Sequence, residues 1–268
     1  MTQTISFFVC FFGVALWESF RPRTAHSVSA RLRWTANISL GVINLLVFGV
    51  LLPDSIFTRP EWVPSIVRNT WQAIDKVPLL AFGLAFLLLD LFDYWMHRVF
   101  HAVPVLWRLH MIHHADPEID ASTAMRHHPL EFLAGSLFRM LPAVALGVPA
   151  AIIFVYLLVA GGIVCFHHGN IGLPKSIAAL AGAIFVTPDV HRIHHSVVID
   201  EGNSNFGAVF SFWDRVFGTY VSKSPAEQER IEFGLREYSD PRYCEVLRVM
   251  GMPFSSRRPR TATSFNVQ

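Results

Sequence analysis

Residues 93–114 read DYWMHRVFHAVPVLWRLHMIHH and hold two histidine patterns, His97-x-x-x-His101 and His110-x-x-His113-His114. On a helix, residues three or four positions apart share one face, so we expect each pattern to direct its imidazoles toward one place. A second His-x-x-His-His pattern, HRIHH, occupies residues 191–195. The spacing predicts that the chain folds to bring these three sets of imidazoles together around metal.

Composition places much of the chain in lipid. Of its 268 residues, 52% are hydrophobic and only 16% are charged, and the mean hydropathy is +0.40. A soluble domain carries about 25% charged residues. The net charge of +2 is too small to favour nucleic acid as a partner, and the sequence has neither a glycine-rich phosphate loop nor a basic strip interleaved with aromatic residues.

Five apolar segments predict an all-α integral membrane bundle of about four or five helices with a histidine-rich cap. They are residues 5–17, 38–52, 77–92, 130–147 and 149–166, and a full span needs about 20 residues. Gly147-Val148-Pro149 splits the last two, which predicts a helical hairpin. A hairpin returns to the side that it left, so His128 and His168 should lie on the face that holds residues 97–114. Residues 176–186 are too short to span and predict an interfacial helix.

Arginine placement predicts the orientation of this multi-pass chain. The loop on the histidine face carries Arg21, Arg23, Arg31 and Arg33, whereas the opposite loop carries Arg59, Arg68 and Lys76. Because short cytoplasmic loops are enriched in Lys and Arg, we expect the histidine face to be cytoplasmic. The first segment lacks a basic region and a small-residue cleavage site, so we expect it to be retained.

The number of candidate ligands exceeds what one metal ion can hold. Imidazole nitrogen suits iron, copper, zinc and nickel, and a catalytic zinc uses about three protein ligands. The sequence has no Cys-x-x-Cys pair, no Glu-x-x-His pattern and no His-Glu-x-x-His motif. The set is therefore sufficient for two ions with open positions, and its members are His97, His101, His110, His113, His114, His128, His168, His191, His194 and His195.

These patterns, together with their neighbours, resemble the fatty acid hydroxylase / sterol desaturase superfamily over residues 89–220. Residue 206 is Phe where that superfamily often has Tyr, which removes a hydroxyl but no ligand. Besides the three histidine patterns, the matching segments are RHHPLE at 126–131, HGN at 168–170, TPDVHR at 187–192, NFG at 205–207 and WDRVFGT at 213–219.

The resemblance implies a non-haem di-iron centre held by histidines, and zinc can replace the two iron ions in purified protein because it binds such sites more tightly. It also implies oxygen-dependent hydroxylation, or alternatively desaturation, of an unactivated C–H bond in a lipid substrate. The sequence shows no flavin, haem or iron–sulfur motif. We therefore expect an external electron donor, a ferredoxin- or cytochrome b5-type reductase system.

Two polar residues are candidates to orient ligands or metal-bound water. Asp93 lies four positions before His97 and either accepts the second N–H of that ring or is a helix-end carboxylate in water. Asn170 follows the HG pair and is either a partner of the centre or an ordinary turn residue. Asp90 is an ionisable group in an apolar segment, which marks a functional hypothesis.

Two rival functions remain at the level of sequence. A membrane metal transporter would need histidines or acids along a spanning path, and a zinc hydrolase would need fewer ligands and a general base. The expected organisation is an N-terminal membrane region (1–88), a hydroxylase-like catalytic domain (89–220) and a C-terminal cytoplasmic segment with a disordered tail (221–268).

Overall fold

The computed structural model describes residues 2–25, 27–51, 65 and 78–257. The described chain is helical, and its only β pairing consists of isolated bridges, so the expected all-α fold is confirmed. The predicted loop residues Arg59, Arg68 and Lys76 and most of the C-terminal tail lie outside the described residues. The long helices are α1 (Thr2–Phe20), α2 (Ala30–Leu51), α4 (Pro78–Ala102), α6 (Pro129–Ala145) and α7 (Ala150–His168).

Three of these helices, α2, α4 and α7, are long and apolar enough to cross a membrane. Their outward faces carry large apolar side chains, such as Leu46 at 65% exposed and Leu79 at 83% exposed. In water such faces would need a covering partner, whereas in lipid they need none. The chain is therefore an integral membrane protein.

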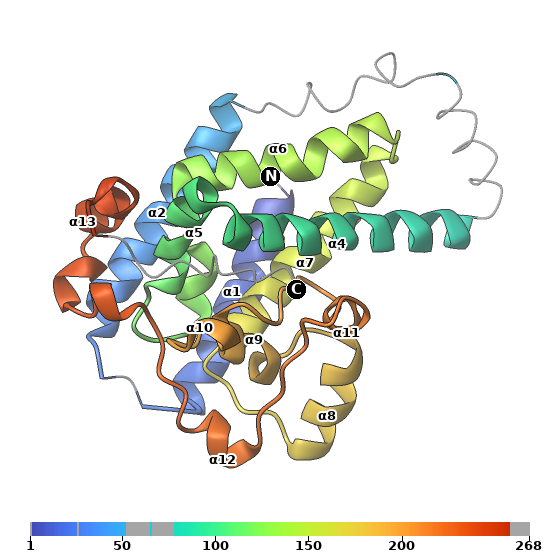
Figure 1. The fold of residues 1–268 in the computed structure, drawn as a ribbon. Coiled ribbons are helices and arrows are strands. Elements are labelled where there is room, and N and C mark those ends of the chain that lie inside the picture. Colours follow the sequence, from blue (N-terminus) through green and yellow to red (C-terminus); the bar gives the residue numbers. More distant parts are fainter. Residues whose placement is uncertain (1, 26, 52–64, 66–77, 258–268) are drawn as a thin grey trace, which may run out of the picture.

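The predicted hairpin is formed by α6 and α7, which a short connection joins at residues 146–149 (Figure 1). Gly147 takes a φ of 62° in this connection, a left-handed conformation that costs glycine little. Both helices pack against α4, where Phe86 meets Tyr156 edge to face at 5.0 Å between ring centroids. The first turn of α6 and the last turn of α7 consequently reach the same end of α4.

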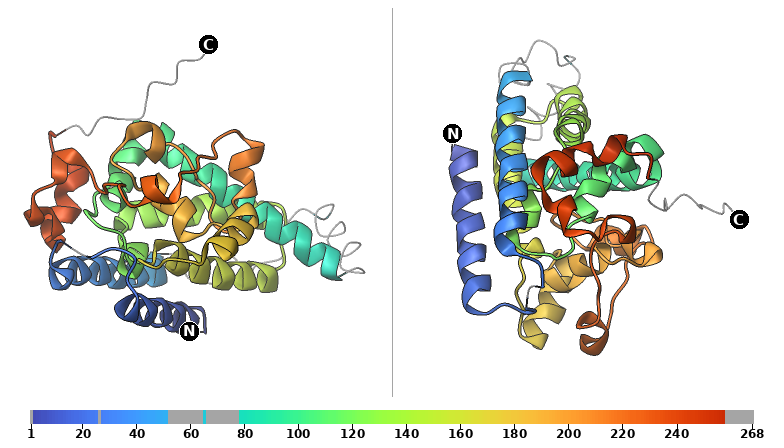
Figure 2. Two further views of the ribbon diagram at one scale, coloured as in Figure 1. Left: turned by 90° about the horizontal axis from the view of Figure 1, so that it is seen from below. Right: turned by 90° about the vertical axis from the view of Figure 1, so that its left-hand side faces the viewer.

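Short helices gather at that end and form the cap, on one side of the layer that contains α1 and α2 (Figure 2). The C-terminal ones pack on α2 and α5 through a shared core that includes Leu40, Met111 and Val249. The short elements are α5 (Pro104–His114), η3 (Ala121–Met125), α8 (Lys175–Ile184), α9 (Pro188–His194), α10 (Ile199–Gly202), α11 (Phe212–Val216), α12 (Pro225–Gln228), η4 (Arg236–Tyr238), η5 (Pro241–Cys244), α13 (Val246–Gly251) and η6 (Met252–Phe254).

Buried ion pairs attach the cap to the membrane helices. Arg33, which the sequence placed in an open basic loop, lies in α2 and donates to Asp116 at 2.6 Å and to Asp120 at 2.6 Å. Both carboxylates belong to the segment that follows α5. A buried charge needs such partners, because an uncompensated one costs several kcal/mol. The loop after α5 is thereby fixed in place.

Asp90 makes a second attachment. Its carboxylate accepts hydrogen bonds from the backbone N–H of Val209 at 3.0 Å and the indole N–H of Trp213 at 2.9 Å, and it lies 3.2 Å from the hydroxyl oxygen of Tyr156. Asp90, the ionisable group in an apolar segment, thus links the cap segment before α11 to α4 and α7.

Candidate metal centre

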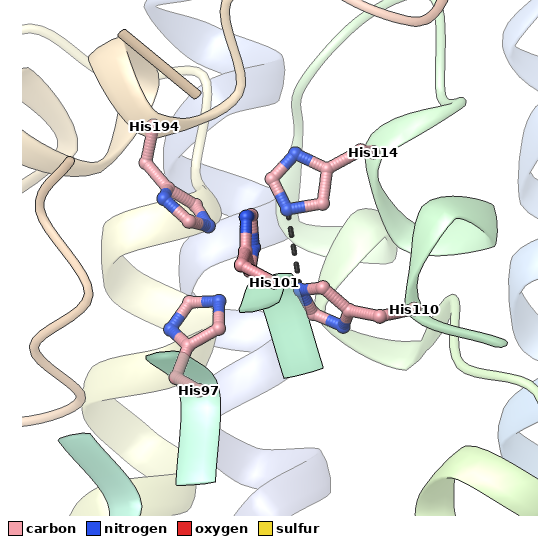
Figure 3. A group of neighbouring side chains, drawn as sticks. All are labelled: His97, His101, His110, His114 and His194. Atoms are coloured by element: carbon pink, nitrogen blue, oxygen red, sulfur yellow. Dashed lines mark hydrogen bonds between the residues drawn. The ribbon is translucent and has the colours of Figure 1, made fainter. Parts of the chain in front are cut away.

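Nine imidazoles converge in two groups where α4, α5, α7 and α9 meet. The five-histidine group consists of His97 and His101 from α4, His110 and His114 from α5, and His194 from α9 (Figure 3). The four-histidine group consists of His113 from α5, His168 from α7, and His191 and His195 from α9 and its C-cap. Within each group the candidate ligand atoms all lie within 4.8 Å of one another.

Each His-x-x-His-His pattern is divided between the two groups, whereas the sequence suggested that each pattern serves one place. Residues four apart share a helix face, but an adjacent residue points about 100° away. In α5, His110 and His114 therefore face the five-histidine group while His113 faces the other. In α9 the assignment is reversed, so that His194 alone joins the five-histidine group.

Backbone carbonyls fix the tautomers of three of these rings. The Nδ1 atom of His97 lies 2.9 Å from the carbonyl oxygen of Phe206, that of His194 lies 2.7 Å from Ser204 O, and that of His168 lies 2.7 Å from Val164 O. A carbonyl oxygen only accepts, so each Nδ1 carries the proton and donates it. The Nε2 atom of each neutral ring is left with a free lone pair directed into its group.

The spacing of the Nε2 atoms fits ligands of a common ion. Two ligands at about 2.1 Å from a metal and at right angles to each other are about 3 Å apart. The buried Nε2 atoms of His97, His101 and His194 have no hydrogen-bond partner among the described residues, as expected of atoms meant for a metal. The short Nε2–Nε2 distances are 3.2 Å for His110–His114, 3.1 Å for His113–His168, and 3.0 Å for both His168–His191 and His191–His195.

The protonation of these ligands also favours metal. Burial, and then the neighbouring imidazoles, hold the pKa of His113, His114, His191 and His195 well below the usual range. A neutral imidazole is the form that binds metal. At neutral pH the rings therefore need not lose a proton first.

His128 lies outside both groups. Its side chain forms the N-cap of α6, where Nδ1 accepts a hydrogen bond from the backbone N–H of Leu130 at 3.1 Å. Its neighbour His127 is the ring that reaches the centre, stacking on His113 at 4.5 Å between centroids. His167 similarly stacks on His191 at 4.0 Å. In a pair of adjacent histidines, the sequence alone does not show which one faces inward.

Asp93 and Asn170, which were expected to orient ligands or metal-bound water, bind other groups. Asp93 accepts hydrogen bonds from Arg139 and from the hydroxyl of Tyr156 at 2.6 Å, while the Nδ1 atom of His97 is taken by the carbonyl of Phe206. The side chain of Asn170 exchanges hydrogen bonds with Thr24. Asp93 thus ties α4 to α6 and α7 one turn away from the ligand that it was expected to orient.

The loop that supplies Phe206 O was not singled out for this role by its sequence. Asn205 takes a φ of 54°, which is uncommon for a residue with a side chain, and its amide nitrogen donates to Val190 O and Val221 O. Asp214 accepts from the backbone N–H groups of Phe206 and Gly207. The NFG and WDRVFGT segments are therefore a clamp that holds the carbonyl against His97.

A helical membrane protein with two all-histidine groups at one end of its bundle has the donor set of a membrane metalloprotein. Residues 82–219 match the family model described as fatty acid hydroxylase. The chain belongs to the fatty acid hydroxylase family, which confirms the resemblance read from its motifs.

Curated relatives agree with this assignment. The chain is 31% identical to an ornithine lipid hydroxylase of Rhizobium tropici over 181 residues, which are 67% of this chain and 53% of the relative. It is 32% identical to the human alkylglycerol monooxygenase (56% of this chain, 32% of the relative) and 27% identical to the human lathosterol oxidase (52% and 44%). The chain thus spans about a third to a half of the length of these relatives. No solved structure matches it.

Proposed function

We propose that the chain is a membrane oxygenase holding two iron ions, one in each histidine group. The observation that carries this proposal is the convergence of five and four imidazoles, without a carboxylate in either group. Nine ligands are too many for one ion and leave open positions on two. His128, which caps α6, is not included among the ligands.

The reaction proposed is hydroxylation of an unactivated C–H bond in a membrane lipid. Bound iron supplies the oxygen activation that such a bond requires. The protein's own contribution is to hold neutral donors in a buried place, fix their ring orientation through Phe206 O, Ser204 O and Val164 O, and keep bulk water out. The relatives named for hydroxylation or oxidation of ornithine lipid, alkylglycerol and lathosterol support a lipid substrate. Desaturation needs the same ligands and is the alternative outcome.

The electrons are proposed to come from a separate reductase system of the ferredoxin or cytochrome b5 type. We place the metal end of this multi-pass bundle in the cytoplasm, where such donors are found. Arg23 and Arg33 lie at that end, where they pair with Asp189 and Asp116, which supports this orientation. Both groups lie together at one end of the bundle and not along a spanning path, which argues against metal transport.

Metal analysis and oxygen uptake of the purified protein test the proposal together. We expect two iron ions per chain after iron loading, oxygen consumption that depends on an added reductant, and lipid products heavier by one oxygen atom. Lipid profiles of a deletion strain against its parent would identify the substrate, since a desaturase product is instead lighter by two hydrogens. A single tightly bound zinc ion with no oxygen uptake after iron loading would refute the oxygenase.

A further inference from the structure

A buried carboxylate lies beside the five-histidine group. Glu131 is in the first turn of α6, and its Oε1 atom accepts hydrogen bonds from Nδ1 of His110 at 2.7 Å and from Nδ1 of His127 at 2.8 Å. Its Oε2 atom accepts the backbone N–H of His128 at 3.2 Å. One side chain therefore caps a helix and binds two imidazoles at once.

This arrangement distinguishes His110 from His97, His101 and His194 of the same group. The Nδ1 atoms of His97 and His194 meet neutral carbonyls, and that of His101 is 3.4 Å from the side-chain oxygen of Asn203. A carboxylate partner makes an imidazole a stronger donor than a neutral partner does, and it fixes the ring with its other nitrogen toward the metal.

The same carboxylate also reaches toward the four-histidine group. The ring of His127, which it holds, stacks on His113 with an angle of 13° between the ring planes. That contact is a ring stack and not a bond to a ligand nitrogen. The effect of the carboxylate on the four-histidine group should therefore be much smaller than its effect through His110.

We propose that Glu131 is a positioning residue of the metal centre, which orients His110 and strengthens it as a donor to the ion in the five-histidine group. The inference rests on the proposed two-ion function. Removing such a partner typically costs roughly 10- to 100-fold in metal affinity. The loss should fall on one of the two ions.

Cobalt(II) titration of the metal-free, full-length protein tests this inference, because the visible absorption of bound cobalt reports the ligand set of each ion. The variants are Glu131→Ala, which removes both imidazole bonds, and Glu131→Gln, which keeps the size of the side chain but removes its charge. The matched control is Glu227→Ala. Glu227 occupies the same position in the capping box of α12, but it is exposed and binds only Ser224.

We expect wild type and Glu227→Ala to bind two cobalt ions alike. Glu131→Ala should bind one ion roughly 10- to 100-fold more weakly, with an altered spectrum, and the other within about threefold of wild type. Glu131→Gln should fall between the two. If Glu131→Ala does not fold, a wild-type titration and spectrum for Glu131→Gln overturns the role of the carboxylate. Two ions bound normally by both variants would refute this inference alone, whereas a wild type that binds fewer than two would refute the proposed function.

Discussion

The substitution His128→Asn tests whether His128 is a metal ligand or the N-cap of α6. Asparagine is a strong N-cap residue, so its side-chain oxygen can replace Nδ1 in accepting from the first turn of α6, whereas it cannot act as an imidazole ligand. The loss is then the packing of the buried ring near Phe254, 5.8 Å between centroids, and its hydrogen bond with the backbone of Met250. We expect a cost of about 1 kcal/mol and a Tm lower by about 2–4 °C. His128→Ala, which also removes the cap, should cost about 1 kcal/mol more.

The assay measures iron per chain and thermal unfolding on the same preparations. His128→Asn should retain the metal content of wild type. The control is His168→Asn, in which a ring of the four-histidine group is removed, and it should lose the ion of that group. If folded His128→Asn loses an equivalent of iron as His168→Asn does, then His128 is a ligand and its assignment as a cap is wrong.

Four further substitutions probe the centre and its supports. His113→Ala and His194→Ala each remove a ligand from a different group, so metal analysis should show that each variant loses one of the two ions; wild-type iron content in either would contradict the ligand assignment. Asp116→Asn removes one of the carboxylates that pair with the buried guanidinium of Arg33, while Asp120 remains. It should lower the free energy of unfolding by about 1–3 kcal/mol, measured by thermal unfolding, and an unchanged Tm would exclude the buried pair. Gly207→Ala would place a Cβ 2.5 Å from a backbone oxygen, so we expect a destabilisation of about 1–3 kcal/mol. We also expect weaker cobalt binding in the five-histidine group, and unchanged cobalt binding by the folded variant would contradict the role of the clamp.

Much of the architecture was predictable because hydrophobic segments and histidine spacing are local signals. The apolar runs predicted α2, α4, α6 and α7, and the break at Gly147 predicted their connection. The split of each His-x-x-His-His pattern also follows from helical geometry. Adjacent residues in a helix diverge by about 100°, so one such pattern cannot direct all three of its rings to one ion.

The groups that hydrogen-bond the ligand histidines could not be predicted from local signals, because tertiary contacts supply them. Asp93 is one helical turn from His97, yet it pairs with Arg139, and the partner of His97 is a backbone carbonyl more than a hundred residues later. Every residue has a backbone carbonyl, so the sequence does not show which carbonyl binds a histidine. Glu131 was visible as part of the RHHPLE segment, but its hydrogen bonds to His110 and His127 appear only in the folded chain.

The distribution of ligands over four helices has a consequence for biogenesis. His97 is made first and His195 last, 98 positions later, and neither group is complete until α9 has packed against α7. The carbonyls of Ser204 and Phe206, which orient two rings, are translated later still. A nascent chain that stalls before residue 204 therefore exposes histidines but offers no finished site. We therefore expect stable metal uptake to be a late event, after membrane insertion and closure of the cap.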